Sequence, residues 1–372
     1  MKILKNTLSV LLALVLVLLP FVTVVTLAVA LPPQYSDTFV GALDEKYNRL
    51  TSIEEDKIVV VGGSSVAFGL DSERLERYTG MPVVNFGLYA ALGTKLMLDL
   101  SRRGIEEGDI VVLTPEMDPQ TLSLYFSSEN TLKAIDDDFS LFFKTDVENW
   151  FPMLGGMWRH ASDKLERYLN SLDNPNTGSS TEIYQSKYFD EYGDFDYPRE
   201  NNIMQLYFDQ NTPIDLDKDN LKEEFYLFTD YLNEYIEYCE RRGATVYFSF
   251  PPMNELALTS ASTDPEIRAE FVAHLEEEIN CPFITEIDDM IMDAGYFFDT
   301  NFHLNDAGVI ARTFTLGEDL CRVMELGDID DDVPPPPALP SLDSAPVAAL
   351  PESGVFTAAQ PESGAVRSRR CA

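Results

Sequence analysis

The chain is poor in histidine, in paired cysteines and in positive charge. Its 372 residues include three histidines and four cysteines, and no Cys-x-x-Cys occurs, which excludes zinc-ribbon and thioredoxin-like sites. The formal charge of −36 excludes nucleic-acid binding through the bulk electrostatic field, because phosphates attract a basic surface. The stretch 62–67 lacks the G-x-G-x-x-G spacing, so a dinucleotide-binding domain is a weak alternative. No pattern predicts a metal site or a cofactor.

One long apolar run is present, within residues 1–31. It follows Lys2 and Lys5, and it is long enough to cross a bilayer as a helix. No other Lys or Arg precedes Lys46, so the charge bias predicts a cytoplasmic N-terminus and an extracytoplasmic remainder. Residues 28–30 (Ala-Val-Ala) resemble a signal-peptide cleavage site, but the run exceeds a usual signal core, so we favour an uncleaved anchor. We therefore expect a single-pass protein of the cell membrane.

The rest of the chain alternates short β-branched runs with helical patterns. This alternation predicts an α/β fold, a doubly wound parallel sheet with helices on both faces. We expect a juxtamembrane helix within 32–56, and then an α/β domain over 57–326. The expected strands are 57–61, 82–86, 109–113, 245–250 and a short one near 282–285. The main expected helices of this domain are 72–78, 94–103, 221–239, 265–279 and 305–324.

A large insertion separates the two halves of this alternation, at about 117–218. It is acidic and aromatic-rich, with mainly helical character predicted at 146–154 and 157–172. A lid or substrate-binding subdomain and a purely structural cover are equally compatible with this composition. The acidic loop 215–220 lacks the Gly and Glu of a calcium loop and is interpreted as a helix cap. Residues 327–372 are rich in Pro, Ala and Ser, which predicts a disordered tail.

Polar residues and glycines follow several of the expected strands. Gly63 and Ser64 follow the first strand, Gly87 the second and Glu116 the third, while Asn254 follows the fourth. Because the carboxyl ends of parallel strands share one edge of the sheet, these residues are expected to meet there. A serine in a strand-to-helix turn is a candidate nucleophile, since nearby backbone N–H groups can stabilise an oxyanion.

A second candidate lies near the end of the α/β domain. His303 follows Asp299 by four residues and precedes Asn305, which is a good helix N-cap. A histidine at a helix start with a carboxylate close by fits a general base that activates a serine. The alternative is a surface histidine in a polar loop. The presence of Ser64 at the other end of the domain favours the catalytic interpretation.

These residues together resemble the SGNH (GDSL-like) hydrolase superfamily, which has a flavodoxin-like α/β fold. The closest resemblance is to its membrane-anchored bacterial branch, similar to the D-alanyl transfer protein of teichoic acids and to alginate O-acetylation proteins. Gly62-Gly63-Ser64-Ser65 matches the Gly-Asp-Ser block, with Ser64 as nucleophile and Ser65 as the alternative if the match shifts by one. Residues 84–87 resemble the second block, whose glycine donates to the oxyanion; here that is Gly87.

Two positions depart from the family pattern. The Gly-x-Asn of the third block is absent, and the strand ends in Thr114-Pro115-Glu116. An ionised glutamate cannot donate a hydrogen bond, which leaves the oxyanion to backbone groups. Asn254 is a substitute donor or a turn former, the latter being favoured. The Asp299–His303 spacing is one residue longer than the usual Asp-x-x-His.

The resemblance implies an extracytoplasmic serine esterase or O-acyltransferase without a cofactor. Ser64 would attack an acylated cell-envelope glycan or lipid, His303 would transfer the proton, and Asp299 would orient His303. The absent third-block Asn favours a different class of function, a non-catalytic envelope protein. Such a protein would bind polymer or assist a membrane-bound O-acyltransferase.

Overall fold

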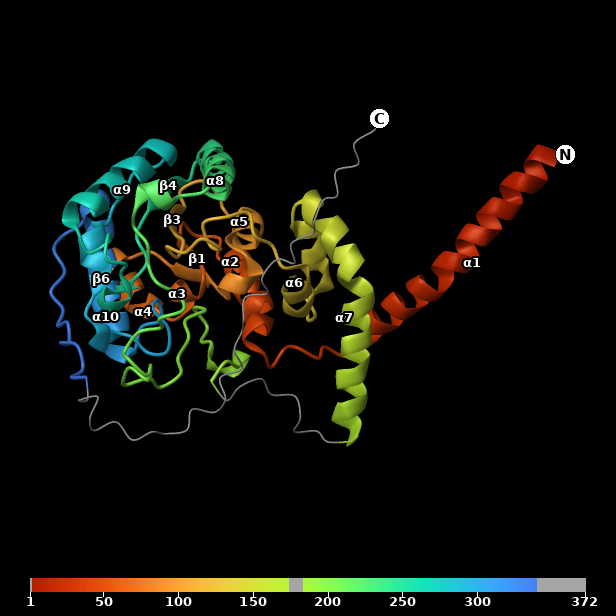
Figure 1. The fold of residues 1–372 in the computed structure, drawn as a ribbon, viewed down its shortest axis with the longest axis horizontal. Coiled ribbons are helices and arrows are strands. Elements are labelled where there is room, and N and C mark those ends of the chain that lie inside the picture. Colours follow the sequence, from red (N-terminus) through yellow and green to blue (C-terminus); the bar gives the residue numbers. More distant parts are fainter. Residues whose placement is uncertain (1, 174–182, 340–372) are drawn as a thin grey trace, which may run out of the picture. The chain divides into compact units, whose positions relative to one another are not determined.

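The computed structural model describes residues 2–173 and 183–339 (Figure 1). Most of the tail that was predicted to be disordered, residues 340–372, lies outside the described residues. Residues 327–339 form one compact unit with the rest of the described chain and contain no helix or strand.

The core of the structure is a parallel sheet of four strands in the order β2-β1-β3-β4. The strands are β1 (Ile58–Gly62), β2 (Val83–Gly87), β3 (Ile110–Thr114) and β4 (Thr245–Phe248). In register, Gly62 lies beside Gly87 on one side and beside Thr114 on the other. The four predicted strands are thus confirmed. The fifth, near 282–285, is reduced to a single parallel bridge between Phe248 and Phe283.

Helices cover both faces of this sheet, as the apolar strands require. On one face, α4 (Ser72–Thr79) and α10 (Asp306–Val323) pack on Ile58 and Val60 of β1. The helices on the other face are α2 (Leu43–Ser52), preceded by η1 (Phe39–Ala42), with α5 (Thr94–Ser101) and α8 (Glu223–Arg241). α9 (Pro265–Glu278) also packs into this second core, and a short helix, α3 (Ser64–Ala67), follows β1 directly.

The helix ends match their sequence signals. Asp71 caps α4 by accepting a hydrogen bond from the Arg74 N–H at 2.8 Å, and Gly80 ends it with φ +72°. Asn305 caps α10 through the Gly308 N–H at 3.0 Å. This last cap fixes where the chain leaves the His303 loop.

The insertion contains α6 (Ser128–Ala134), α7 (Val147–Asp173) and the 3-10 segments η3 (Phe139–Lys144), η4 (Ser186–Tyr188) and η5 (Lys218–Asn220). The two helices predicted at 146–154 and 157–172 are one continuous helix, α7, which accommodates Pro152 and Gly155-Gly156. A two-stranded sheet of β5 (Met253–Asn254) and β6 (Ile291–Met292) was not predicted. The remaining 3-10 segments are η2 (Ala90–Leu92), η6 (Glu255–Ala257), η7 (Ile287–Met290) and η8 (Ala294–Tyr296).

The N-terminal apolar run forms one helix, α1 (Lys2–Ala30). Its segment Ser9–Leu27 is long and apolar enough to span a membrane, and its side chains are exposed rather than packed in a core. Near its C-terminal end α1 packs against α7, where the Phe21 ring stacks on Trp158.

A buried ion pair lies at the amino ends of β1 and β3. Lys57 Nζ lies 3.0 Å from Asp109 Oδ2, and both side chains are at most 2% exposed. Asp109 also accepts the N–H groups of Lys57 and Glu106, at 3.1 and 2.9 Å. The pair therefore joins β1 to the turn before β3.

Replacing Asp109 by Ala is expected to lower the free energy of unfolding by about 3–5 kcal/mol, because Lys57 is left buried without its counter-ion. Urea unfolding of the detergent-solubilised chain measures this loss. The control is Glu129→Ala, which removes the more exposed Glu129–Lys133 pair and is expected to cost less than about 1 kcal/mol. Equal losses for both variants would contradict the role given to the buried pair.

Candidate active site

Ser64 stands in the turn that leads from the carboxyl end of β1 into α3. Gly63 is the N-cap of this helix, Ser64 its first residue, and the Phe68 N–H donates to Ser64 O at 2.9 Å. Ser64 is 7% exposed, whereas Ser65 is fully buried, and its hydroxyl has no hydrogen-bond partner within residues 2–173 and 183–339. The greater exposure favours Ser64 over Ser65 as the residue that meets a substrate.

Glu116, just beyond β3, makes the direct contact with this turn. Its Oε1 accepts hydrogen bonds from Ser64 Oγ at 3.1 Å and from the Ser65 N–H at 2.7 Å. A Cβ atom at Gly63 would lie 2.8 Å from the same oxygen, so glycine permits this approach. The sequence predicted Glu116 at the carboxyl edge of the sheet, and in the structure it accepts a hydrogen bond from Ser64.

A second carboxylate lies close to Glu116. Burial, and then the negative charge of Glu116, raise the pKa of Asp118 to about 6, against hydrogen bonds from Thr121 and Gln120. The turn after β3 therefore carries two carboxyl groups close together, and one of them, Glu116, hydrogen bonds to Ser64.

Asp299 and His303 are hydrogen-bonded to each other in the loop before α10. His303 Nδ1 lies 2.8 Å from Asp299 Oδ1, and the other carboxylate oxygen accepts a hydrogen bond from the Tyr184 hydroxyl at 2.5 Å. Thr300 Oγ1 accepts the His303 N–H at 3.0 Å, which fits the longer Asp-to-His spacing into a tight turn. With Nδ1–H donated to Asp299, Nε2 keeps its lone pair and has the form that a general base requires.

Aromatic packing connects the His303 loop to the serine turn. The His303 ring stacks on Phe68, with centroids 4.0 Å apart and planes at 3°. Phe68 caps α3, the helix that Ser64 begins. Phe68 thus links the His303 loop to the helix that Ser64 begins, although Ser64 Oγ hydrogen bonds to Glu116 and makes no such bond to His303 among the described residues.

Two buried arginines donate hydrogen bonds to backbone carbonyls of the serine turn and the His303 loop. Arg312 of α10 donates to Ser65 O at 3.3 Å, to Gly69 O at 3.0 Å and to Thr114 Oγ1 at 3.2 Å. Burial lowers its pKa to about 10, against the opposing charge of Glu116, so Arg312 stays charged at neutral pH. Arg199 of the insertion donates to Phe68 O at 3.0 Å and to Leu304 O at 2.7 Å.

The other two predicted site residues have partners elsewhere. The Gly87 N–H donates to Asn85 Oδ1 at 3.1 Å, so it has to leave that acceptor before it can bind an oxyanion. A Cβ at Gly87 would lie 2.3 Å from Val66 Cβ, which explains the glycine by packing on α3. Asn254 is buried, donates to Tyr207 O at 2.7 Å and accepts the Leu256 N–H, as a turn former does.

The site also contains residues that were not singled out from the sequence, among them Phe68, Tyr184, Arg199 and Arg312. Arg312 had a usable signal, since it lies among the apolar positions that bury α10. Tyr184 was one of many aromatic residues in the insertion, and nothing local marks it. Burial and the Asp299 charge raise the pKa of Tyr184 well above its usual value, which keeps it a donor.

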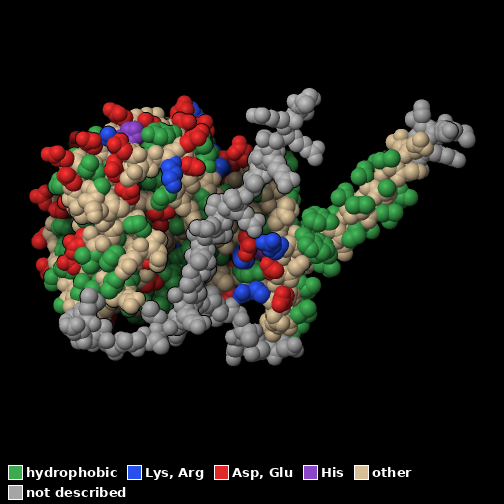
Figure 2. All heavy atoms as spheres, viewed as in Figure 1, with side chains coloured by type: hydrophobic (Ala, Val, Ile, Leu, Met, Phe, Trp, Pro, Cys, Tyr) green, Lys and Arg blue, Asp and Glu red, His purple; other side chains and the backbone are tan. Residues whose placement is uncertain are grey.

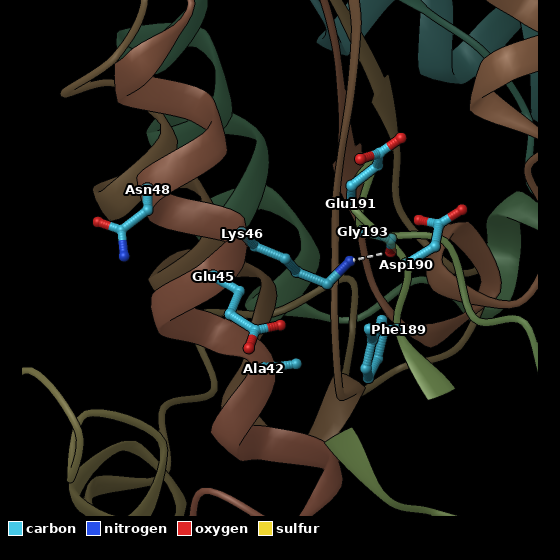
Figure 3. Close-up of a pocket in the computed structure, with 8 residues that line it drawn as sticks. All are labelled: Ala42, Glu45, Lys46, Asn48, Phe189, Asp190, Glu191 and Gly193. Carbon is cyan, nitrogen blue, oxygen red and sulfur yellow. Dashed lines mark hydrogen bonds between the residues drawn. The ribbon is translucent and has the colours of Figure 1, made fainter. Parts of the chain in front are cut away.

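The pocket in Figure 3 is separate from these residues. It has a volume of about 320 Å³ and lies between α2 and the insertion, with Lys46, Phe189 and Gly193 in its lining. Burial lowers the pKa of Lys46 to about 7, against the charges of Asp194 and Asp190. Because Lys46 Nζ already donates to the carbonyls of Asn85 and Gly193, the pocket marks a structural junction.

No protein-family model matches the chain, and neither does any curated protein.

Replacing Glu116 by Gln is expected to lower the pKa of Asp118 from about 6 towards its usual range. The substitution removes the neighbouring negative charge while keeping an acceptor for Ser64. Carbon-detected NMR titration of the Asp118 carboxyl measures this, with exposed Glu277→Gln as the control that leaves the titration unchanged. An unaltered Asp118 titration in Glu116→Gln would show that the two carboxylates do not interact.

Proposed function

We propose that the chain is a membrane-anchored serine ester hydrolase or O-acyltransferase of SGNH type. Its substrate is an acylated cell-envelope glycan or lipid. The observation that carries the proposal is the Asp299–His303 hydrogen bond at 2.8 Å, with His303 stacked on the helix that Ser64 begins. A carboxylate, a correctly oriented imidazole and a serine at a strand end form the arrangement that activates a hydroxyl.

The proposed reaction begins with attack of Ser64 Oγ on the ester carbonyl carbon. The Ser64 proton passes to His303 Nε2 while the carbonyl electrons move onto oxygen. Collapse of this intermediate expels the alcohol, which takes the proton from His303, and leaves an acyl group on Ser64. Attack by water then completes hydrolysis, and attack by an acceptor hydroxyl completes transfer, with His303 again as the base.

Before attack, Ser64 has to turn from Glu116 towards His303. Catalytic hydrogen bonds are often unformed in the absence of substrate, so the observed rotamer is compatible with this step. Asp299 holds the imidazolium that forms, and Tyr184 holds Asp299. These contacts make Tyr184 a positioning residue contributed by the insertion.

The fold agrees with the proposed class. The order β2-β1-β3-β4, with Phe283 bridged beyond β4, follows the flavodoxin-like sequence of strands. The helix α1 supports membrane anchoring, and Lys2 and Lys5, ahead of its apolar segment Ser9–Leu27, support a cytoplasmic N-terminus with the α/β domain outside.

A non-catalytic envelope protein is the second candidate function. The observations that favour it are the hydrogen bond from Ser64 to Glu116 and the engagement of the Gly87 N–H by Asn85. On this alternative the same surface binds polymer or assists a membrane-bound O-acyltransferase, and Ser64 has no acyl intermediate.

Hydrolysis of a short acyl ester by the detergent-solubilised chain tests the two candidates. Ser64→Ala and His303→Ala are each expected to lower kcat at least about a thousand-fold, because nucleophile and base act as a unit. Ser65→Ala is the matched control, expected to stay within about threefold of the unmodified chain. Loss of activity in Ser65→Ala but not in Ser64→Ala would identify Ser65 as the nucleophile. Absence of turnover by the unmodified chain would favour the non-catalytic candidate.

Tyr184→Phe is expected to lower kcat about tenfold with KM unchanged, because it removes one charge-assisted hydrogen bond to Asp299 and no substrate contact. Steady-state kinetics on the same ester separate the two constants. Tyr226→Phe, on the remote helix α8, serves as the control. A rise in KM without a change in kcat would assign Tyr184 to substrate binding instead.

A further inference from the structure

The helix α7 carries a narrow stripe of exposed apolar side chains. Its members are Phe151, Leu154, Trp158, Leu165, Leu169 and Leu172, whose exposed fractions run from 45% to 77%. At about 100° per residue, all six fall within about 60° of one another around the helix. Large apolar side chains concentrated in this way on a surface mark an interaction face.

A second face of α7, centred about 95° around the helix axis from the stripe, packs on its own domain. Met153, Met157 and Ala161 are buried, and Lys164 Nζ lies 2.6 Å from Asp136 Oδ1. The rotation of α7 about its axis is therefore fixed. The apolar stripe remains on the outside of the described structure.

The membrane-spanning candidate α1 lies against this stripe. The Phe21 and Trp158 rings stack with centroids 6.5 Å apart and planes at 17°, and Figure 1 shows the C-terminal end of α1 beside α7. Phe21 is inside the apolar segment Ser9–Leu27 and six residues from its end, which is about 9 Å along the helix. When α1 spans a bilayer, Trp158 thus lies level with a point about 9 Å inside the end of the apolar segment, within the roughly 5–10 Å that the apolar face of an interfacial helix reaches.

We propose that α7 is an interfacial membrane helix, with its stripe in the lipid of the leaflet through which α1 leaves the bilayer. Figure 2 shows hydrophobic side chains along α1 and along the adjacent part of α7. The neighbouring span Ser9–Leu27 has no buried residue and is exposed except at the half-buried Phe21, Val24 and Val25, so lipid is the medium that adjoins both helices. The domain is then held against the membrane by two helices in different orientations. This inference depends on α1 as an anchor and not on the chemistry of Ser64.

Spin-label accessibility tests the proposal on the full chain in phosphatidylcholine nanodiscs. In a Cys371→Ser background, a nitroxide is attached to Leu169→Cys on the stripe or to Asn170→Cys, about 100° around the same turn. Cys239, Cys281 and Cys321 are buried and do not compete for the label. Leu16→Cys in α1 gives the value for the bilayer interior.

The ratio of oxygen to nickel-chelate collision rates is expected to be at least about threefold higher at Leu169 than at Asn170, and to approach that at Leu16. Three outcomes would overturn the proposal. Nickel accessibility at Leu169 equal to that at Asn170 places α7 in water. An immobile label at Leu169 that neither reagent reaches means that protein covers the stripe. Nickel accessibility at Leu16 removes α1 from the bilayer.

The two tryptophans allow an independent measurement without labelling. Trp150→Phe leaves Trp158 as the single tryptophan of the chain. Its fluorescence is expected to be quenched by phosphatidylcholine brominated along the acyl chains, and to be poorly quenched by aqueous iodide. Strong iodide quenching with no effect of brominated lipid contradicts the proposal.

Discussion

The serine turn depends on three buried side chains that hydrogen bond to its backbone. Glu116 Oε1 accepts the Ser65 N–H at 2.7 Å, Arg312 donates to Ser65 O at 3.3 Å, and Asn85 donates to Val66 O at 2.9 Å. They come from the end of β3, from α10 and from β2, so the turn has its observed shape only when the sheet and its last helix are assembled. The position of Ser64 is therefore a property of the whole α/β domain.

One carboxylate, Glu116, affects both the shape of this turn and the hydrogen bonding of Ser64. Glu116 stabilises the turn through Ser65 and also takes the Ser64 hydroxyl as a donor. The contact that holds Ser64 thus directs its hydroxyl proton towards Glu116. In the proposed enzyme Ser64 leaves Glu116, whereas in a binding protein of the same fold it stays there. The Asp299–His303 hydrogen bond is already formed while Ser64 is bound to Glu116.

The sequence predicted what is local and periodic. The four strands and the caps at Asp71 and Asn305 follow from apolar runs and capping residues, and the structure confirms them. Features that depend on distant residues were not predicted. Nothing in the sequence near Tyr184 indicates its hydrogen bond to Asp299. The Gly87 N–H donates to the Asn85 side chain two residues away, and this contact depends on the conformation of the folded strand. Two helices, 146–154 and 157–172, were predicted on either side of Gly155-Gly156, yet packing of Met153 and Met157 carries α7 through these glycines as one helix.

The most direct test of the central claim is covalent labelling by a fluorophosphonate, followed by mass-spectrometric mapping of the modified residue. The reagent reacts with a serine hydroxyl only when a base removes its proton. The account predicts modification at Ser64 in the unmodified chain and none in His303→Ala. Labelling at another serine, or at Ser64 with equal rate in His303→Ala, would contradict it.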